Sequence, residues 1–269
     1  MNKIVNLIKS NIRKDAKQTI SFFFIIIFAS ALLYIGFITA KGYQNLWDVK
    51  IKECQTPDIL SVVESKDTAA IEKALDNTNG IKNYSRTDMV YTIIMNKIGD
   101  EENVGDILFQ PYSDFGICDN PNMIEKSEHN YENAIYLPIV CKYYWDSELD
   151  TEFKCTIGDV EYTFMIAGFF ERMMTGGNGV YRYSMFVNDE DYKLISENPI
   201  SHNDTGYFIN IDENEDDAKI SVRITKELGK YQITTFNIFK SDAKFARMHL
   251  PNILSSVLIA FSLIAVVVT

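Results

Sequence analysis

The chain has 269 residues, 46% hydrophobic and 13% aromatic, which is enough for one sizeable folded domain besides any membrane segments. Its net charge of −11 is unevenly spread: residues 1–41 carry about +5, residues 42–249 about −16 and residues 250–269 none. Such an acidic centre excludes nucleic acid and anionic lipid headgroups as preferred partners. It suits a cationic ligand, although acidic surfaces also serve solubility alone.

A basic, amphipathic segment comes first. Ile4, Ile8 and Ile12 recur at every fourth position, and lysines and arginines occupy much of the remaining surface. A helix of this kind lies in the cytoplasmic membrane interface with its apolar face inward. We therefore predict a cytoplasmic amphipathic helix over 1–18; the alternative is that this segment simply continues the next helix into water.

The first predicted membrane span follows. Ile20 to Ile38 are 19 residues without a charge and would be about 28 Å long as a helix, close to a bilayer core. Basic residues mark the cytoplasmic end of a span, and five precede this one: Lys3, Lys9, Arg13, Lys14 and Lys17. We predict a transmembrane helix over 19–40, with the N-terminus in the cytoplasm and residues 41–249 outside.

The same stretch has a second interpretation, a cleaved signal peptide with Thr39 and Ala40 near the cleavage site. The apolar core of a signal peptide usually has about 7–15 residues. This one is longer and follows a long basic region, so its length favours a retained anchor.

The first part of the outward region predicts a stalk and then a β-α-β unit over about 56–98. Residues 41–53 extend the helix, and Thr56-Pro57 ends it because the residue before a proline avoids the helical conformation. The unit consists of a strand over Asp58–Glu64, a helix that Asp67 caps and that runs to Asn77 before Asn79-Gly80 close it, and a strand over Arg86–Ile98.

A second β-α-β unit is predicted over about 205–237. It consists of a strand over Gly206–Ile211, an acid-capped helix over Glu215–Leu228 that stops at Gly229, and a strand over Tyr231–Phe236. Two such units apart in sequence predict a split βαβ, ferredoxin-like domain that is interrupted in the middle.

The interrupting segment, about 99–204, is rich in predicted strands. β-branched and aromatic residues concentrate in four runs: Ala134–Tyr143, Glu152–Ile157, Glu161–Phe169 and Tyr181–Val187. Other signals predict a tight turn at Gly158-Asp159, a mobile loop at Thr175–Gly179 and a short helix over Asn188–Ser196.

The end of the chain predicts a second stalk and a second span. Asp242–His249 favour a stalk helix within 240–249, and Pro251 introduces an apolar run of 16 residues over Ile253–Val268. As a helix this run would be about 24 Å long. It has no polar flank after it, so we expect a truncated transmembrane helix over 250–269 and an N-terminal fragment of a longer protein.

The sequence contains no motif that indicates an enzyme. It has no G-x-x-x-x-G-K-[ST] loop, no G-x-S-x-G elbow and no H-E-x-x-H. The acidic runs Asp189–Asp191 and Asp212–Asp217 lack the spacing of calcium loops, and each opens a predicted helix. We predict no catalytic residue, no cofactor and no metal site, and surface positions for His129, His202 and His249.

Four cysteines lie in the outward region: Cys54, Cys118, Cys141 and Cys155. An even number there permits two disulfides in three connectivities. No pair has the C-x-x-C spacing of zinc sites, and Cys141 and Cys155 lie in apolar runs, where buried free thiols are common. The sequence leaves their disulfide status open.

Two groups of residues carry a family resemblance. Asn6–Arg13 run directly into Thr19–Gly36, as a basic helix followed at once by a span. In the outward region an apolar strand, a G-D turn, a strand ending in glycine and a tyrosine-containing strand succeed one another over Ala134–Pro138, Ile157–Asp159, Tyr162–Gly168 and Tyr181–Val187. This order of parts, which covers most of the chain, resembles the FtsX/MacB-type ABC transporter permeases.

The resemblance implies a membrane subunit that forms homo- or heterodimers and works with a separate cytoplasmic ATPase. Such permeases usually have four spans or more, and their external domain divides into a βαβ-type part and an inserted β-rich part. Many transmit ATP-driven motion to that domain, to move lipoproteins, expel peptides or regulate cell-wall enzymes. Spans three and four, and the loop before span three that would contact the ATPase, are absent from this chain.

The sequence thus predicts an α+β membrane protein in which two transmembrane helices flank an extracytoplasmic split βαβ (ferredoxin-like) domain with a β-rich insertion. Its predicted function is that of an FtsX/MacB-type permease subunit in the cell membrane, with a peptide or lipoprotein as candidate substrate. The alternatives are a membrane-anchored extracytoplasmic ligand sensor and an anchored structural or adhesive domain. The amphipathic helix over 1–18 favours the permease, because a simple sensor or adhesin does not need one.

Overall fold

The structure is a computed structural model that describes residues 16–64, 67–98, 101–176 and 182–268. It divides into two compact units, one made of residues up to Asp48 and from Met248 onward, the other of Val49–Arg247. Most of the predicted amphipathic helix over 1–18 and most of the predicted glycine-rich loop lie outside the described residues.

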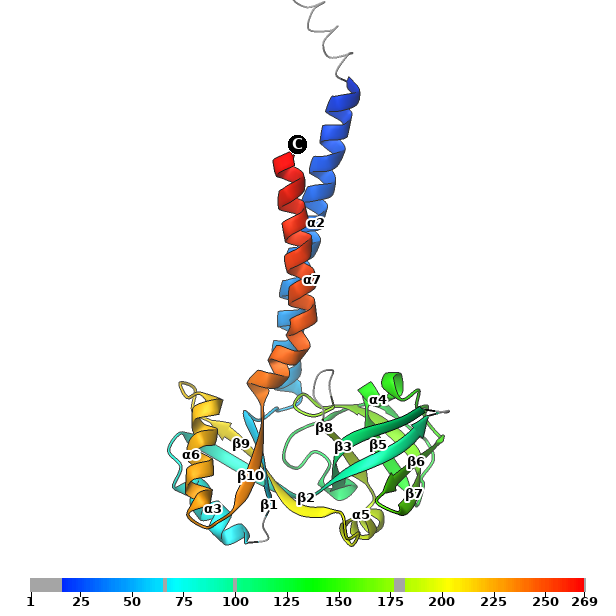
Figure 1. The fold of residues 1–269 in the computed structure, drawn as a ribbon, viewed down its shortest axis with the longest axis vertical. Helices are drawn as coiled ribbons and strands as arrows, with labels where there is room; N and C mark the ends of the chain where they lie inside the picture. Colours follow the sequence, from blue (N-terminus) through cyan, green and yellow to red (C-terminus); the bar gives the residue numbers. More distant parts are fainter. Residues whose placement is uncertain (1–15, 65–66, 99–100, 177–181, 269) are drawn as a thin grey trace, which may run out of the picture. The chain divides into compact units, whose positions relative to one another are not determined.

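Two long apolar helices make up the first unit (Figure 1). Helix α2 runs over Ala16–Glu53 and helix α7 over Lys240–Val268, so each continues into the second unit. Both are long and apolar enough to cross a membrane. Large apolar side chains such as Phe23 and Phe24 are exposed, as expected of a surface that meets lipid or another protein.

Small residues line the contact between α2 and α7. The Ser255 hydroxyl donates to the Gly36 carbonyl (2.7 Å), and the Ser262 hydroxyl donates to the Ala29 carbonyl (2.6 Å). Because one residue number falls as the other rises, the two helices are antiparallel. Close backbone approach at small residues, with side-chain hydrogen bonds across, is typical of helix pairs in membranes.

The second unit contains ten strands among its described residues. They are β1 (Ile59–Glu64), β2 (Ile81–Ile98), β3 (Glu101–Pro111), β4 (Asn122–Lys126), β5 (Ala134–Pro138), β6 (Glu152–Ile157), β7 (Val160–Glu171), β8 (Arg182–Val187), β9 (His202–Ile211) and β10 (Thr234–Phe239). The order in the sheet is β10-β1-β9-β2-β3-β8-β5-β7-β4, and β6 pairs with β2 and β7. The shorter helices are α3 (Thr68–Asp76), the 3-10 helix η1 (Tyr112–Asp114), α4 (Ile139–Tyr144), α5 (Asp189–Ser196) and α6 (Asp217–Gly229).

The four strands β10, β1, β9 and β2 pair in antiparallel fashion and are covered on one face by α3 and α6 (Figure 1). Helix α6 buries Ile220, Ile224 and Leu228, at every fourth position, against this face. Asp67 caps α3 by accepting a backbone N–H bond, as predicted, and Asp216 caps α6 in the same way, so that α6 begins at Asp217 and not at Glu215. Both β-α-β units expected from the sequence therefore contain their strands and helices.

Strands β3, β5, β6, β7 and β8, together with part of β2, surround a second core that is rich in aromatic and aliphatic side chains. Strand β6 has the predicted bounds, and the predicted turn at Gly158-Asp159 joins it to β7, with Gly158 at φ +60°. The predicted helix after β8 is also confirmed, because Asn188 caps α5 by accepting from the Asp191 N–H.

Several predicted boundaries in this unit are wrong. The strand predicted over Ala134–Tyr143 ends at Pro138, after which α4 begins. Proline cannot donate to a ladder, and its fixed φ suits the residue before a first helical turn, so the apolar run changes from strand to helix there. The strand predicted from Tyr231 starts only at Thr234, because Tyr231 and Ile233 donate to the Leu228 carbonyl in the turn that ends α6.

Two further differences concern glycine and proline signals. Of the pair Asn79-Gly80, only Gly80 adopts a positive φ (+96°), and α3 already ends at Asp76. Pro251 lies inside α7 and does not introduce a separate span. A proline removes one helical hydrogen bond, and in an apolar helix with a close neighbour that loss is tolerated.

Candidate functional site

The end of helix α2 is fastened to the β-rich part of the second unit. The last carbonyls of a helix have no partner inside the helix. Here Asn120 supplies two donors, its backbone N–H to the Cys54 carbonyl (2.9 Å) and its Nδ2 to the Glu53 carbonyl (3.0 Å). One turn earlier, Lys50 forms an ion pair with Glu171 at the end of β7 (3.0 Å).

The start of helix α7 is fastened to the antiparallel half by Asp58. The Asp58 carboxylate pairs with Lys240 Nζ and accepts from the Ile211 N–H (2.9 Å), and the Asp58 carbonyl accepts from the Lys240 N–H (3.0 Å). Asp58 precedes β1, Ile211 ends β9 and Lys240 begins α7. One aspartate therefore connects three chain segments at this point.

Arg247 of α7 reaches the β-rich part at the residues that follow β7. Its Nη2 donates to the Arg172 carbonyl (2.8 Å), and its Nη1 lies 3.3 Å from Met173 Sδ. Met173 and Met174 are both buried. Lys50 at the end of α2 and Arg247 of α7 therefore contact neighbouring residues at the end of β7, Glu171 and Arg172.

Arg172 is itself held by a buried network. Its guanidinium donates two hydrogen bonds to the Asp119 carboxylate (2.6 and 2.9 Å) and one to Gln110 Oε1 (2.5 Å). The side chains of Arg172 and Asp119 are only 3% and 7% exposed. Removing one member of a buried ion pair such as Arg172–Asp119 lowers the free energy of unfolding by about 3–5 kcal/mol. This pair therefore holds Arg172 firmly in place. We name the following residues the helix junction: Lys50, Asp58, Asn120, Glu171, Arg172, Lys240 and Arg247.

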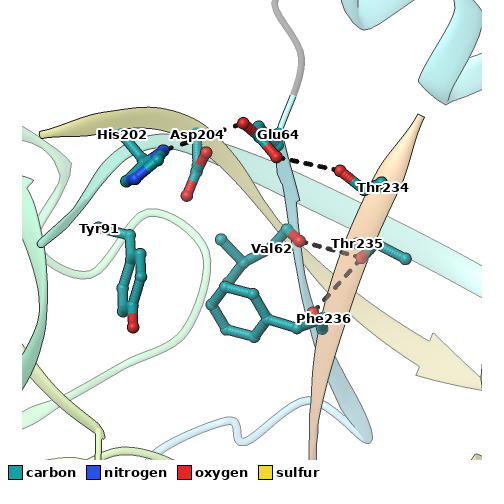
Figure 2. A pocket seen from close by; sticks show the side chains of 8 residues that line it. All are labelled: Val62, Glu64, Tyr91, His202, Asp204, Thr234, Thr235 and Phe236. Atoms are coloured by element: carbon teal, nitrogen blue, oxygen red, sulfur yellow. Dashed lines mark hydrogen bonds and ion pairs between the residues drawn. The ribbon is translucent and has the colours of Figure 1, made fainter. Parts of the chain in front are cut away.

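A pocket of about 280 Å³ opens on the other face of the antiparallel strands (Figure 2). Side chains alternate between the faces of a strand. Ile59 and Val63 of β1 pack under α3 and α6, so Val62 and Glu64 point to the opposite face. The pocket is lined there by Val62, Glu64, Tyr91, His202, Asp204, Thr234, Thr235 and Phe236.

Asp204 is the most unusual group in this pocket. The residue is 8% exposed, and its Oδ1 has no hydrogen-bond partner among the residues the structure describes. Figure 2 shows its carboxylate pointing into the space between Tyr91 and Val62. The pKa of Asp204 is raised to about 6: burial raises it most, nearby His202 lowers it, and Glu64 raises it by a smaller amount.

The other polar groups of the pocket are more exposed and have partners. Glu64 accepts from the Thr234 hydroxyl (3.1 Å), and His202 Nδ1 lies 3.9 Å from the Glu64 carboxylate. Both interactions are drawn in Figure 2. Glu64 therefore extends the negative charge of Asp204 to the rim of the pocket.

An aromatic wall completes the pocket. Tyr91 and Phe236 make an edge-to-face contact with ring centroids 5.8 Å apart. The guanidinium of Arg182 lies over Phe236, 4.2 Å from the ring centroid, and its Nε is 3.8 Å from the Asp106 carboxylate. Burial raises the pKa of the Tyr91 hydroxyl, so this group stays neutral at physiological pH.

The histidines and cysteines considered in the sequence analysis do not form one site in the structure. His129, His202 and His249 are exposed, as predicted, but His202 also borders the pocket. All four cysteines are free, and burial raises the pKa of each thiol. Within the described ranges, no group of three His, Cys, Asp or Glu side chains is arranged to hold a metal ion.

Sequence reasoning missed Asp204 and the helix junction for different reasons. The predicted strand began at Gly206, whereas β9 begins at His202, so Asp204 fell outside the element that positions it. Asp204 and Phe208 lie four residues apart in β9 and so share one face of the strand. This spacing was the signal in the sequence that could have indicated a buried acid. The junction joins residues such as Lys50 and Glu171 that are far apart in sequence, and no local pattern indicates such pairs.

Comparison with known proteins gives matches at the level of structure. No protein-family model matches the sequence, and neither does any curated protein. The chain is similar to the extracellular domain of the noncanonic ABC-type transporter YknZ from Gram-positive bacteria, with 8% identity and a TM-score of 0.34, covering 66% of this chain and 100% of that one.

Two further solved structures are similar. The periplasmic region of MacB from Actinobacillus actinomycetemcomitans has 8% identity and a TM-score of 0.33, and the match covers 72% of this chain and 94% of that one. A domain of a protein described as a permease from Porphyromonas gingivalis has 11% identity and a TM-score of 0.34, over 67% and 88% of the two chains.

The structural neighbours are external domains of FtsX/MacB-type ABC transporter permeases. At these TM-scores they supply no residue-by-residue correspondence, so the role of each residue in this chain rests on its own contacts.

Proposed function

We propose that this chain is the membrane subunit of an FtsX/MacB-type ABC transporter, which couples a separate cytoplasmic ATPase to motion of its external domain. The helix junction is the observation that supports coupling. Buried and charged contacts tie the end of α2 and the start of α7 to the sheet, so a displacement of either helix end is passed to β1, β7 and β9.

The proposed architecture is that of the external domain of such a permease. The strand order β10-β1-β9-β2, antiparallel throughout and with α3 and α6 on one face, supports a split βαβ, ferredoxin-like domain. Strands β3 to β8 would be its β-rich insertion. Two apolar helices that flank this domain support a place in the cell membrane, with residues 41–249 outside and the N-terminus in the cytoplasm.

The proposed partners are a cytoplasmic ATPase and a second permease subunit, identical or related. A transporter of this type needs no catalytic residue of its own, so we propose that the chain is not an enzyme. Its proposed cargo is a peptide or lipoprotein that the external domain moves.

Co-purification tests this function. The membrane subunit, tagged and extracted from its native membrane, should bring with it a protein that contains G-x-x-x-x-G-K-[ST]. A kinase or cyclase in its place, or no nucleotide-binding partner, would contradict the transporter.

Coupling is tested with the purified pair in liposomes. Arg247→Gln removes the guanidinium that reaches Arg172 and Met173, and charge-assisted hydrogen bonds of this kind contribute about 1.5–3 kcal/mol. The transport rate per ATP hydrolysed should fall about fivefold or more. Arg223→Gln is the matched control, because Arg223 pairs with Glu215 away from the junction; an equal loss in both variants would argue against the junction.

A second function, the membrane-anchored ligand sensor, is favoured by one observation, the open pocket with its buried carboxylate. A sensor would bind its ligand without any associated ATPase. The co-purification experiment separates the two functions.

A further inference from the structure

The pocket in Figure 2 has the size and the shape of a small binding site. Its volume of about 280 Å³ is several times the roughly 30 Å³ that one water molecule occupies in the liquid. Its walls come from four neighbouring strands, β1, β2, β9 and β10, so its geometry is fixed by the sheet. A site of this volume accommodates one amino-acid side chain or a small molecule of similar size.

Asp204 makes the pocket favourable for a positively charged or hydrogen-bond-donating ligand. A carboxylate that is removed from water without a partner is costly, and the cost disappears when a cation or a donor reaches it. Asp204 is more than nine-tenths buried, points into the pocket and has an oxygen without a partner in the described part of the chain. Glu64 adds a second negative charge at the rim.

The remaining walls distinguish between kinds of cation. A metal ion requires several oxygen or nitrogen ligands at short distance, and the described residues offer no such group of three here. Val62, Tyr91 and Phe236 instead present apolar and aromatic surface, which suits an alkyl chain or a flat cation. The chain already holds one guanidinium, that of Arg182, over Phe236.

We propose that this pocket binds an organic cation, a primary ammonium or guanidinium group, whose charge pairs with Asp204 and Glu64 and whose carbon chain lies against Val62, Tyr91 and Phe236. Two sources carry this group, the lysine and arginine side chains of a peptide and free polyamines. Binding here holds for either proposed function and does not depend on coupling to ATP.

The test uses residues 1–269 in nanodiscs of zwitterionic lipid, with calorimetric titration at about pH 7.5. The probe is N-acetyl-lysine amide, and its neutral counterpart is N-acetyl-glutamine amide. The native chain should bind the lysine probe saturably and show no saturable binding of the glutamine probe. Asp204→Asn should weaken lysine binding about tenfold or more.

The matched control is Asp212→Asn, which removes the same charge from an exposed position outside the pocket. Its affinity for the lysine probe should equal that of the native chain. Equal binding by the native chain and Asp204→Asn, equal losses in Asp204→Asn and Asp212→Asn, or equal binding of the two probes would each overturn the proposal.

The pH dependence gives an independent readout. The charged and titratable groups that face Asp204 are Glu64 from β1, Tyr91 from β2, Tyr192 from α5 and His202 from its own strand, while β10 contributes the uncharged Thr234. Lowering the pH from about 7.5 to about 5 protonates Asp204 and should weaken binding about tenfold. If protonation of Asp204 causes the loss of affinity at low pH, the His202→Gln variant should show the same loss. If the affinity of His202→Gln does not depend on pH, Asp204 is not the group that causes it.

A comparison of spermidine with a tri-lysine peptide of equal charge identifies the source of the cation. Tighter binding of the peptide assigns the site to side chains of a polypeptide, and tighter binding of spermidine assigns it to free polyamines. Failure of both to compete with N-acetyl-lysine amide would contradict the proposed site.

Discussion

Two buried aspartates of the second unit have opposite surroundings. Asp119 is 7% exposed and accepts two hydrogen bonds from Arg172, whereas Asp204 is 8% exposed and its Oδ1 has no partner among the described side chains and backbone. The first carboxylate is compensated by a cation that the fold supplies. The second is left to solvent or to a ligand, and the folded state bears the cost of its charge.

That cost has a definite pH dependence. Burial raises the pKa of Asp204 to about 6, so the folded chain holds this proton more tightly than the unfolded chain, whose aspartates have a pKa near about 4. The stabilisation from the protonated form is fully present below about pH 4 and is lost as the pH rises to about 6. Above that pH the folded state carries the full cost of the buried charge.

Asp204→Asn should therefore raise the free energy of unfolding by about 2–3 kcal/mol at about pH 7.5 and change it little at about pH 4. The measurement is urea unfolding of the chain in detergent, followed by fluorescence of Trp145, which is buried in the second core. Asp212→Asn is the control and should leave both values unchanged. If Asp204→Asn is less stable than the native chain at about pH 7.5, the Asp204 carboxylate must have a stabilising partner in the folded state.

At the scale of elements, the parts that local chemistry determines were predicted well. Helices α3, α5 and α6 carry their own caps and apolar stripes, and the turn at Gly158 needs a positive φ that glycine adopts freely. These signals lie within a few residues of the structure that they specify, so one sequence is sufficient to find them.

The elements that were missed depend on distant partners. Strand β3 contains Glu101, Glu102 and Gly105, a poor strand sequence, yet it pairs with β2 on one side and β8 on the other. The same dependence hid the candidate sites. The pocket brings together four strands, and the helix junction pairs residues more than a hundred positions apart, such as Lys50 with Glu171.

The pair of long helices makes a prediction at the same scale. A Cβ on Gly36 would lie 3.0 Å from Ile259 Cγ1 and 3.2 Å from the Ser255 carbonyl oxygen, so Gly36→Leu should force the two helices apart at a cost of about 1–3 kcal/mol. The readout is the disulfide formed by Ala29→Cys with Ser262→Cys, because the Ser262 hydroxyl lies 2.6 Å from the Ala29 carbonyl oxygen. Gly36→Leu should slow its formation under mild oxidation.

Gly42→Leu is the matched control for this experiment, since a Cβ at Gly42 meets nothing within 4 Å. It should leave the rate of disulfide formation unchanged. If Gly36→Leu and Gly42→Leu form the disulfide equally fast, the small residues do not determine how closely the helices approach.

For the whole molecule, the distribution of charge determines the proposed orientation. The basic residues before the first span would hold the N-terminus in the cytoplasm, and the region after it has a net charge of about −16. The second apolar helix, α7, would then return the chain to the membrane. The helix junction and the pocket both lie in the external part under this orientation, where a ligand from outside reaches them without crossing the bilayer.

Cysteine labelling in intact bacterial cells tests this orientation. Glu213 is exposed, so Glu213→Cys should react with a membrane-impermeant maleimide in intact cells, whereas Lys9→Cys should react only after the membrane is permeabilised. The native chain provides the blank, because Cys54, Cys141 and Cys155 are at most 2% exposed and burial raises the pKa of all four thiols, which leaves little reactive thiolate. Labelling of Lys9→Cys but not Glu213→Cys in intact cells would reverse the topology and place the pocket in the cytoplasm, where it would no longer meet an external ligand.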